Sequence, residues 1–134
     1  MKKRTFCMKK RAGLLRHNNL DIENMMQFAC MHIVVANVSI VYRLPISAIL
    51  DRRRGRRKVS DARQLCQYLC HISFQHSFAK IGKTFNRDRT SVAHACRRIE
   101  DQRDIEHYDM AIEFLGVGVM SLAKSLYVVK DEEK

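Results

Sequence analysis

The sequence predicts an all-α protein with a single compact domain of five to six helices. Apolar residues recur every three or four positions in successive segments, which is the spacing of an amphipathic helix. Polar residues that commonly cap helices, such as Asp21, Ser77 and Asp88, precede several of these segments. The 134 residues, 46% hydrophobic and 29% charged, suffice for one folded core and are too few for two. Together these observations indicate one helical domain.

The chain is expected to consist of a basic arm, residues 1–19, and the domain, residues 20–134. The arm contains seven Lys and Arg residues and no acidic residue, so self-repulsion favours a loosely packed segment. Asp21 is expected to cap a long helix over residues 22–43, which Pro45 ends before a short helical turn over 46–50. The buried positions expected in the long helix are Met26, Ala29, Ile33, Ala36 and Ile40.

A strongly basic segment, residues 51–58, separates these helices from the rest of the domain. Six of its eight residues, DRRRGRRK, are Lys or Arg, and their repulsion together with Gly55 predicts a loop. Ser60 is expected to cap the helix that follows. The apolar stripe of that helix is Leu65, Tyr68, Leu69 and Ile72.

Two short helices, residues 77–85 and 88–102, have the size of a helix-turn-helix. Ser77 and Asp88 are their expected caps, and Asn86 suits the tight turn because Asn tolerates a left-handed backbone. The buried face of the second helix is Val92, Cys96 and Ile99. A last helix is expected over 107–128, with Gly116 and Gly118 lowering its helix propensity and with an apolar face of Met110, Phe114, Leu115, Met120 and Leu122.

The excess of positive charge indicates a polyanionic partner. The 25 Lys and Arg against 14 Asp and Glu give a net charge of +11 and a pI near 9.8. Double-stranded nucleic acid is therefore the first partner to consider and an anionic membrane surface the second. The most apolar run, residues 28–42, is shorter than the roughly 20 residues that a membrane-spanning helix needs. The sequence shows no signal-peptide pattern, and its five cysteines are expected to be free thiols in a reducing compartment. The chain is therefore expected in the cytoplasm, on the nucleoid.

The second helix of the motif has the division of side chains that a recognition helix needs. Arg89 is suited to bind O6 and N7 of guanine, and Thr90 and Ser91 are suited to contact bases. Arg97 or Arg98 is expected to neutralise phosphates. The alternative is a solvated basic face on an ordinary core helix. The candidate DNA-contacting surface is Arg89, Thr90, Ser91, His94, Arg97 and Arg98.

Two stretches of the chain resemble the DNA-binding domain of the bacterial replication initiator DnaA. They are DARQLCQYLC, residues 61–70, and FNRDRTSVAHACRRIED, residues 85–101. Within the second, the string RDxTxVxHACRxI is a highly specific signature. The likeness spans about residues 34–103 and includes an Arg-rich loop just before the Ala-Arg-Gln helix.

The resemblance implies a grip on both grooves of duplex DNA, at sites like the DnaA box TTATNCACA. An Arg of the basic segment would enter the minor groove, and forward alignment places Arg54 there. Because the segment is one residue longer here, Arg53 and Arg56 remain alternatives. Lys83 is a hypothetical phosphate contact without a family counterpart. The base contacts that the resemblance implies are Arg63, Gln64, Asp88, Arg89, Thr90, Ser91 and Ala95.

Two departures from the family pattern concern the turn and the first helical residue after it. Asn86 stands alone where DnaA typically has two glycines, so the turn is one residue shorter. Arg89 stands where most DnaA proteins have His, and a long bidentate donor is expected to change the preferred base at that step.

Several other functions are not expected from this sequence. No G-x-x-x-x-G-K-[ST] motif occurs, so neither the ATPase activity of DnaA nor a nucleotide cofactor is predicted. No catalytic cluster is visible, so we expect no enzyme and no small-molecule substrate. The cysteines and histidines lack the spacing of a zinc site, which favours buried thiols over a bound metal for Cys66, Cys70, His71, His94 and Cys96.

A second hypothesis is a basic adaptor that binds protein or membrane through its terminal helices. The apolar faces of residues 22–42 and 110–128 are large for one small core to bury. They would then form a homodimer or dock another protein. A two-fold dimer predicts paired half-sites about one helical turn of DNA apart. A monomer that contacts both grooves would instead bind one asymmetric site.

Overall fold

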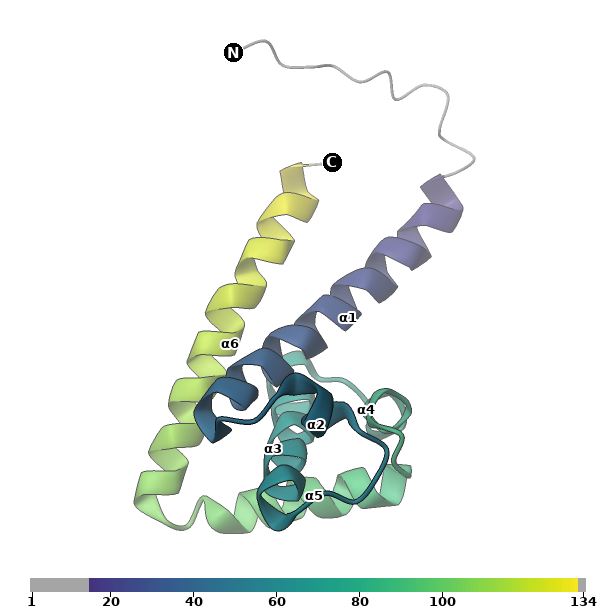
Figure 1. Cartoon of the computed structure of the whole chain (residues 1–134). Coiled ribbons are helices and arrows are strands. Elements are labelled where there is room, and N and C mark those ends of the chain that lie inside the picture. Colours follow the sequence, from purple (N-terminus) through teal and green to yellow (C-terminus); the bar gives the residue numbers. More distant parts are fainter. Residues whose placement is uncertain (1–14, 133–134) are drawn as a thin grey trace.

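The computed structural model describes residues 15–132, and within them it contains six helices and no strand (Figure 1). This confirms the all-α prediction. The helices are α1 (Leu15–Tyr42), α2 (Ile46–Leu50), α3 (Arg57–Phe74), α4 (Phe78–Phe85), α5 (Arg89–Gln102) and α6 (Glu106–Glu132).

Helix α3 is the centre of the molecule, because all five other helices pack against it. Its residues Tyr68 and Leu69 are fully buried, as are Phe85 of α4 and Val92 of α5. Burial of such a large apolar side chain contributes roughly 1.5–3 kcal/mol. The predicted core positions of α3 and α5 are confirmed for Leu65, Tyr68, Leu69, Val92, Cys96 and Ile99, whereas Ile72 is exposed.

The two long helices, α1 and α6, contact each other and extend beyond the compact body in the same direction (Figure 1). Helix α5 lies at the opposite end of the molecule. The predicted buried stripes of both long helices are only partly right, because both helices are apolar on more than one face. Ile33 and Leu115 pack against the core as predicted. In α1 the buried residues include Val34 and Val38, while Ile40 is exposed. In α6 the buried residues are Ile112, Val119 and Ala123, while Met110, Phe114, Met120 and Leu122 are exposed.

Two predicted helix starts also differ from the structure. Helix α1 begins at Leu15, inside the expected arm, so Asp21 lies within the helix and does not cap it. Extending an existing helix costs little, since nucleation is the unfavourable step. Helix α3 begins at Arg57 with Arg56 at its N-cap, so Ser60 lies in its first turns and the loop ends at residue 56. The rest of the expected arm, residues 1–14, lies outside the described residues.

Four cysteines behave as core residues, as predicted. Cys30, Cys66, Cys70 and Cys96 are free thiols and buried. Burial raises the pKa of Cys70 to about 12 and that of Cys96 to about 11. Because the thiolate is the reactive form, these thiols stay protonated and unreactive near neutral pH.

One segment of α1, Glu23–Tyr42, is long and apolar enough to cross a membrane by length and composition alone, with a mean hydropathy of 1.6. A third of its most apolar window is buried inside the molecule. Core helices of proteins without a membrane span meet the same criterion, so this segment is weak evidence for a span.

Candidate nucleic-acid interface

Helices α4 and α5 form a tight helix-turn-helix. The Ser77 hydroxyl caps α4 by accepting a hydrogen bond from the Lys80 backbone N–H at 3.2 Å, as predicted. Asn86 has the expected left-handed backbone, with φ 51° and ψ 49°. The Arg87 N–H then donates to the Gly82 carbonyl at 2.9 Å.

Gly82 sets how closely the two helices approach. A Cβ atom at this position would lie 2.5 Å from the Arg87 backbone oxygen, closer than a Cβ can approach. A methyl group here would therefore force α4 and α5 apart. Gly82 lies within the stretch that resembles DnaA, but its role in packing was not predicted, because a sequence does not show the neighbouring backbone oxygen.

The first turns of α5 present the predicted polar surface. Asp88, Arg89, Thr90 and Ser91 are exposed, as are His94 and Arg97 farther along the helix. Asp88 is the N-cap residue, although its side chain makes no cap hydrogen bond. Ala95 is an exception, since it is only 3% exposed behind Ser91. Ala95 nevertheless lines the hollow beside α5, and its base contact stays a prediction.

The basic loop, residues 51–56, carries four exposed arginines: Arg52, Arg53, Arg54 and Arg56. Asp51 contacts Arg53, because its Oδ1 accepts the Arg53 backbone N–H at 2.9 Å and lies 3.6 Å from the Arg53 Nε, while the Arg53 side chain remains 90% exposed. The backbone hydrogen bond is also the main reason why the pKa of Asp51 is lowered. Arg54 lines the hollow beside Ser91 of α5, which favours it as the residue that reaches DNA.

Arg63 has a structural role that the sequence did not predict. It is only 4% exposed, and its Nε donates to the Ile49 carbonyl at 2.8 Å. Its Nη2 donates to the carbonyls of Asp51 at 3.0 Å and Ala48 at 3.3 Å. The guanidinium of Arg63 secures the end of α2 and the start of the basic loop, and its predicted base contact stays a prediction.

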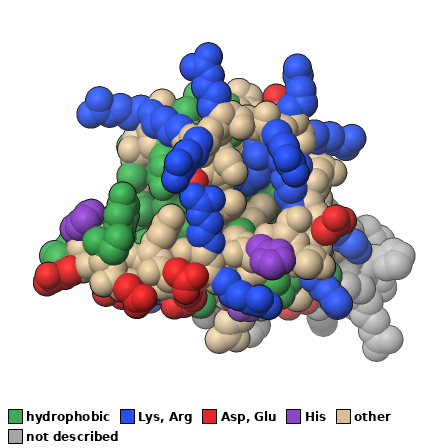
Figure 2. All heavy atoms as spheres, turned by 90° about the horizontal axis from the view of Figure 1, so that it is seen from below, with side chains coloured by type: hydrophobic (Ala, Val, Ile, Leu, Met, Phe, Trp, Pro, Cys, Tyr) green, Lys and Arg blue, Asp and Glu red, His purple; other side chains and the backbone are tan. Residues whose placement is uncertain are grey.

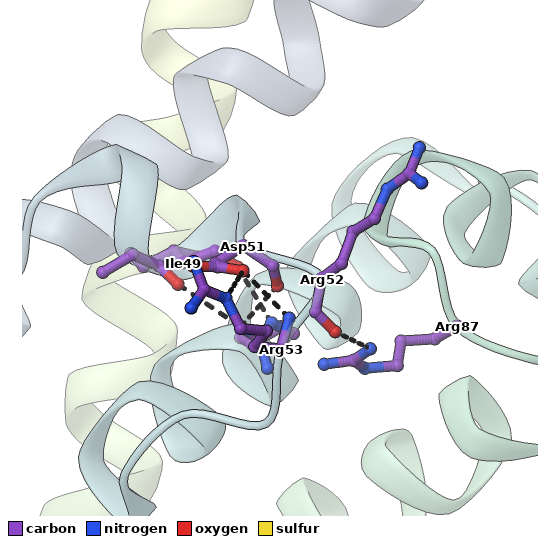
Figure 3. Close-up of polar contacts among 7 residues, drawn as sticks. Ile49, Asp51, Arg52, Arg53 and Arg87 are labelled. Atoms are coloured by element: carbon purple, nitrogen blue, oxygen red, sulfur yellow. Dashed lines mark hydrogen bonds and ion pairs between the residues drawn. The ribbon is translucent and has the colours of Figure 1, made fainter.

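Arg87 joins the basic loop to the helix-turn-helix. Its Nη1 donates to the Arg52 carbonyl at 2.9 Å, across 35 residues of sequence, and to the Asn86 carbonyl at 3.3 Å. Figure 3 shows the Arg87 side chain reaching the Arg52 carbonyl, next to the contacts around Asp51 and Ile49. Sequence reasoning did not select Arg87, because its partner is a backbone atom.

Arg98 links α5 to α3 and is less available than predicted. Its Nη1 donates to Gln64 Oε1 at 3.1 Å, and its Nη2 lies 3.1 Å from Asp61 Oδ1. The contact occupies the carbonyl oxygen of Gln64 and leaves its amide N–H groups to donate. Lys83 is exposed on α4 and carries no such contact in the described part of the chain.

The loop and α5 flank one hollow on the surface. Seen from the end where α5 lies, Lys and Arg side chains surround this hollow and most acidic side chains gather at one edge (Figure 2). Positive charge concentrated around a concave surface attracts a polyanion. The hollow is lined by Arg54, Gly55, Ser60, Arg63, Gln64, Gln67, Asn86, Arg87, Asp88, Ser91 and Ala95.

No group of three or more His, Cys, Asp or Glu side chains in residues 15–132 is arranged to hold a metal ion. The hollow has no enclosed nucleophile or acid–base pair, and arginines, hydroxyls and amides dominate its lining. These groups suit hydrogen bonding to phosphates and base edges.

The fold and the site define a helix-turn-helix DNA-binding domain. The family model of the bacterial DnaA protein helix-turn-helix matches residues 31–99, more than half of the chain, and the chain belongs to this family. The matched module binds double-stranded DNA and is not catalytic.

Two known proteins illustrate the relationship. The chain is 32% identical over 102 residues to the chromosomal replication initiator protein DnaA 1 of Chlamydia pneumoniae. That alignment covers 75% of this chain and 22% of the relative. A crystal structure of a DNA replication initiation factor shares the fold, with a TM-score of 0.72 and 23% identity over 86% of this chain and 36% of that one. The chain thus spans well under half of either protein.

Proposed function

We propose that this protein binds specific sequences in duplex DNA and regulates transcription or replication initiation at sites like the DnaA box. Helix α5 enters the major groove and the basic loop enters the adjacent minor groove. The observation that supports this most strongly is the hydrogen bond from Arg87 to the Arg52 carbonyl, which holds the two DNA-contacting elements beside one hollow.

The residues divide into base readers and phosphate contacts. Arg89, Thr90 and Ser91 in the first turn of α5 read base edges, together with Asp88 and the amide of Gln64. Arg54 enters the minor groove, where a narrow A·T-rich sequence attracts arginine.

The residues proposed to contact phosphates lie on either side of the residues that contact base edges. Lys83, His94 and Arg97 are exposed and neutralise the flanking phosphates. Arg63, Arg87 and Arg98 position these elements.

The regulatory role follows from what the described domain contains. It offers a DNA-binding surface, through which the protein occupies its sites on the nucleoid, in the cytoplasm. Occupancy blocks or recruits the transcription machinery, or competes with an initiator for shared sites.

The test is selection of a random duplex library on the purified protein, followed by binding measurements on the preferred site. Arg89→Ala should cost roughly 1–3 kcal/mol on that site and flatten the preference at one base step. Arg97→Ala is the matched control, since loss of a phosphate contact should weaken all sequences equally. An equal loss on all sequences for Arg89→Ala would contradict base reading by α5.

A further inference from the structure

Helix α6 is apolar on two opposite sides. One side is buried, and the other is largely exposed, with Val117 at the rim of a hollow that Tyr68 and Leu69 of α3 also line. Ile112, Val119 and Ala123 pack inside the molecule. Phe114 is two residues after Ile112 and Val117 two before Val119, which places them about 200° around the helix from the buried side. They are 71% and 63% exposed.

The exposed side forms a regular stripe. Met110, Phe114, Val117 and Val128 are all more than half exposed. With Ser121 and Lys124 they follow one another at intervals of four, three, four, three and four residues, which is the heptad spacing of a helix–helix seam. We call these six residues the outer stripe.

Charge argues against DNA or an anionic membrane as the occupant of this stripe. Helix α6 carries five acidic and two basic residues, a net charge of −3 in a chain of +11. The stripe itself contains one charged residue, Lys124. Such a surface suits another protein helix of the same kind.

The outer stripe is complementary to itself when two copies run antiparallel. A two-fold axis at the level of Val119 sets Met110 against Val128 of the second copy and Val117 against Ser121. Phe114 then meets the partner's Lys124, whose ammonium group can lie over the ring. Phe114 therefore faces a long flexible side chain, Val117 faces a small one, and Met110 makes an apolar contact with Val128.

The area of the stripe fits a dimer. Four large side chains exposed by half or more present on the order of 400 Å² of apolar surface, given about 150–250 Å² for a large residue. Interfaces are about 60% apolar, so the whole contact would bury about 1,300 Å² in total, which lies within the range of specific interfaces.

We propose that the outer stripe of α6 binds a second copy of this chain in antiparallel orientation. Because α6 extends away from the end that carries α5 (Figure 1), the two DNA-binding surfaces of the dimer face outward. The dimer therefore bridges two DNA segments. The bridging rests on the proposed DNA binding, whereas the dimer does not.

Sedimentation velocity of the full chain tests the dimer. Wild type should sediment as a dimer, and Val117→Glu as a monomer with unchanged helix content, since Val117 is 63% exposed and lies only at the rim of a hollow between α6 and α3. Ile40→Glu is the matched control: Ile40 is 75% exposed on α1, outside the stripe, and the variant should remain a dimer. A monomeric wild type, or a dimeric Val117→Glu, overturns the proposal.

Disulfide trapping tests the orientation, in a Cys7→Ser background because Cys7 lies outside the described residues. A mixture of Phe114→Cys and Lys124→Cys chains should form the mixed disulfide readily, and Phe114→Cys alone should not. The reverse result overturns the antiparallel seam. Flotation with phosphatidylglycerol vesicles is the further arm, and binding that Val117→Glu abolishes would assign the stripe to membrane instead.

Bridging is measured as capture of a labelled duplex by an immobilised duplex carrying the same site. Val117→Glu should bind a single duplex with wild-type affinity and lose most of the capture. If wild type binds no duplex, the proposed function fails while the sedimentation result stands. If a dimeric wild type binds one duplex but never captures a second, the bridging is wrong.

Discussion

The end of the molecule that carries α5 and the basic loop is held together differently from the end formed by α1 and α6. At the first end, Arg63 and Arg87 donate from their guanidinium groups to four backbone carbonyls of residues 48–52. At the second, apolar side chains such as Val34 and Val119 pack by burial. Arg103, the C-cap residue of α5, makes polar contacts at the junction between α5 and α6.

This difference indicates what each end tolerates. Hydrogen bonds to a backbone carbonyl fix position and direction, so small changes at the first end should alter DNA binding more than stability. Burial is non-directional, so changes at the second end should alter stability and leave DNA binding intact.

Gly82→Ala should have the largest effect on stability and DNA binding at the end that carries α5. The added Cβ would meet the Arg87 backbone oxygen at 2.5 Å, and such overpacking typically costs about 1–3 kcal/mol. Urea unfolding should show this loss, and specific DNA binding should fall with it because α5 is displaced. Gly116→Ala in α6 is the control: no atom lies within 4 Å of its Cβ position, so it should stabilise by about 0.5–1 kcal/mol. An unchanged urea midpoint for Gly82→Ala would contradict the close approach.

Arg87→Ala tests whether the loop depends on the helix-turn-helix. Loss of the bond to the Arg52 carbonyl should weaken specific binding about tenfold, or about 1.4 kcal/mol, with little change in stability. In an Arg54→Ala background, Arg87→Ala should weaken binding much less, since the loop then lacks the arginine that enters the minor groove. Trypsin should also cut residues 52–56 faster in the free variant. Additive losses with an unchanged cleavage rate would instead make Arg87 a simple phosphate contact.

Arg103→Ala probes the junction between α5 and α6 and should have the smallest effect. Arg103 donates to the Tyr68 hydroxyl at 3.0 Å and to Asp109 Oδ1 at 2.5 Å, and also contacts Glu113. Because these partners are partly exposed, the expected loss of unfolding free energy is only about 1 kcal/mol. DNA affinity measured well below the unfolding midpoint should not change. A loss of affinity as large as that of Arg87→Ala would show that this junction is coupled to the DNA-binding end.

The sequence predicted the parts of this structure that depend on local chemistry. The all-α class, the cap at Ser77 and the left-handed Asn86 follow from residue type and spacing, and the structure has all three. The family signature also identified the exposed first turn of α5, from Arg89 to Ser91.

The remaining features depend on atoms that a sequence pattern does not contain. Arg63 and Arg87 interact with backbone carbonyls, so nothing in the partner residues' identity indicates the contact. The buried stripes of α1 and α6 were partly misassigned because periodicity cannot tell which of two apolar faces is covered. The start of α3 at Arg57 was missed because the repulsion expected within residues 51–58 is relieved by solvent around exposed arginines.

The close contact at Gly82 limits how the DNA preference of this chain can change. No side chain fits between α4 and the Arg87 backbone oxygen, so this contact constrains the angle between the two helices. New target sequences must therefore arise by exchanging residues such as Arg89 on an unmoved backbone, and not by tilting the helix in the groove.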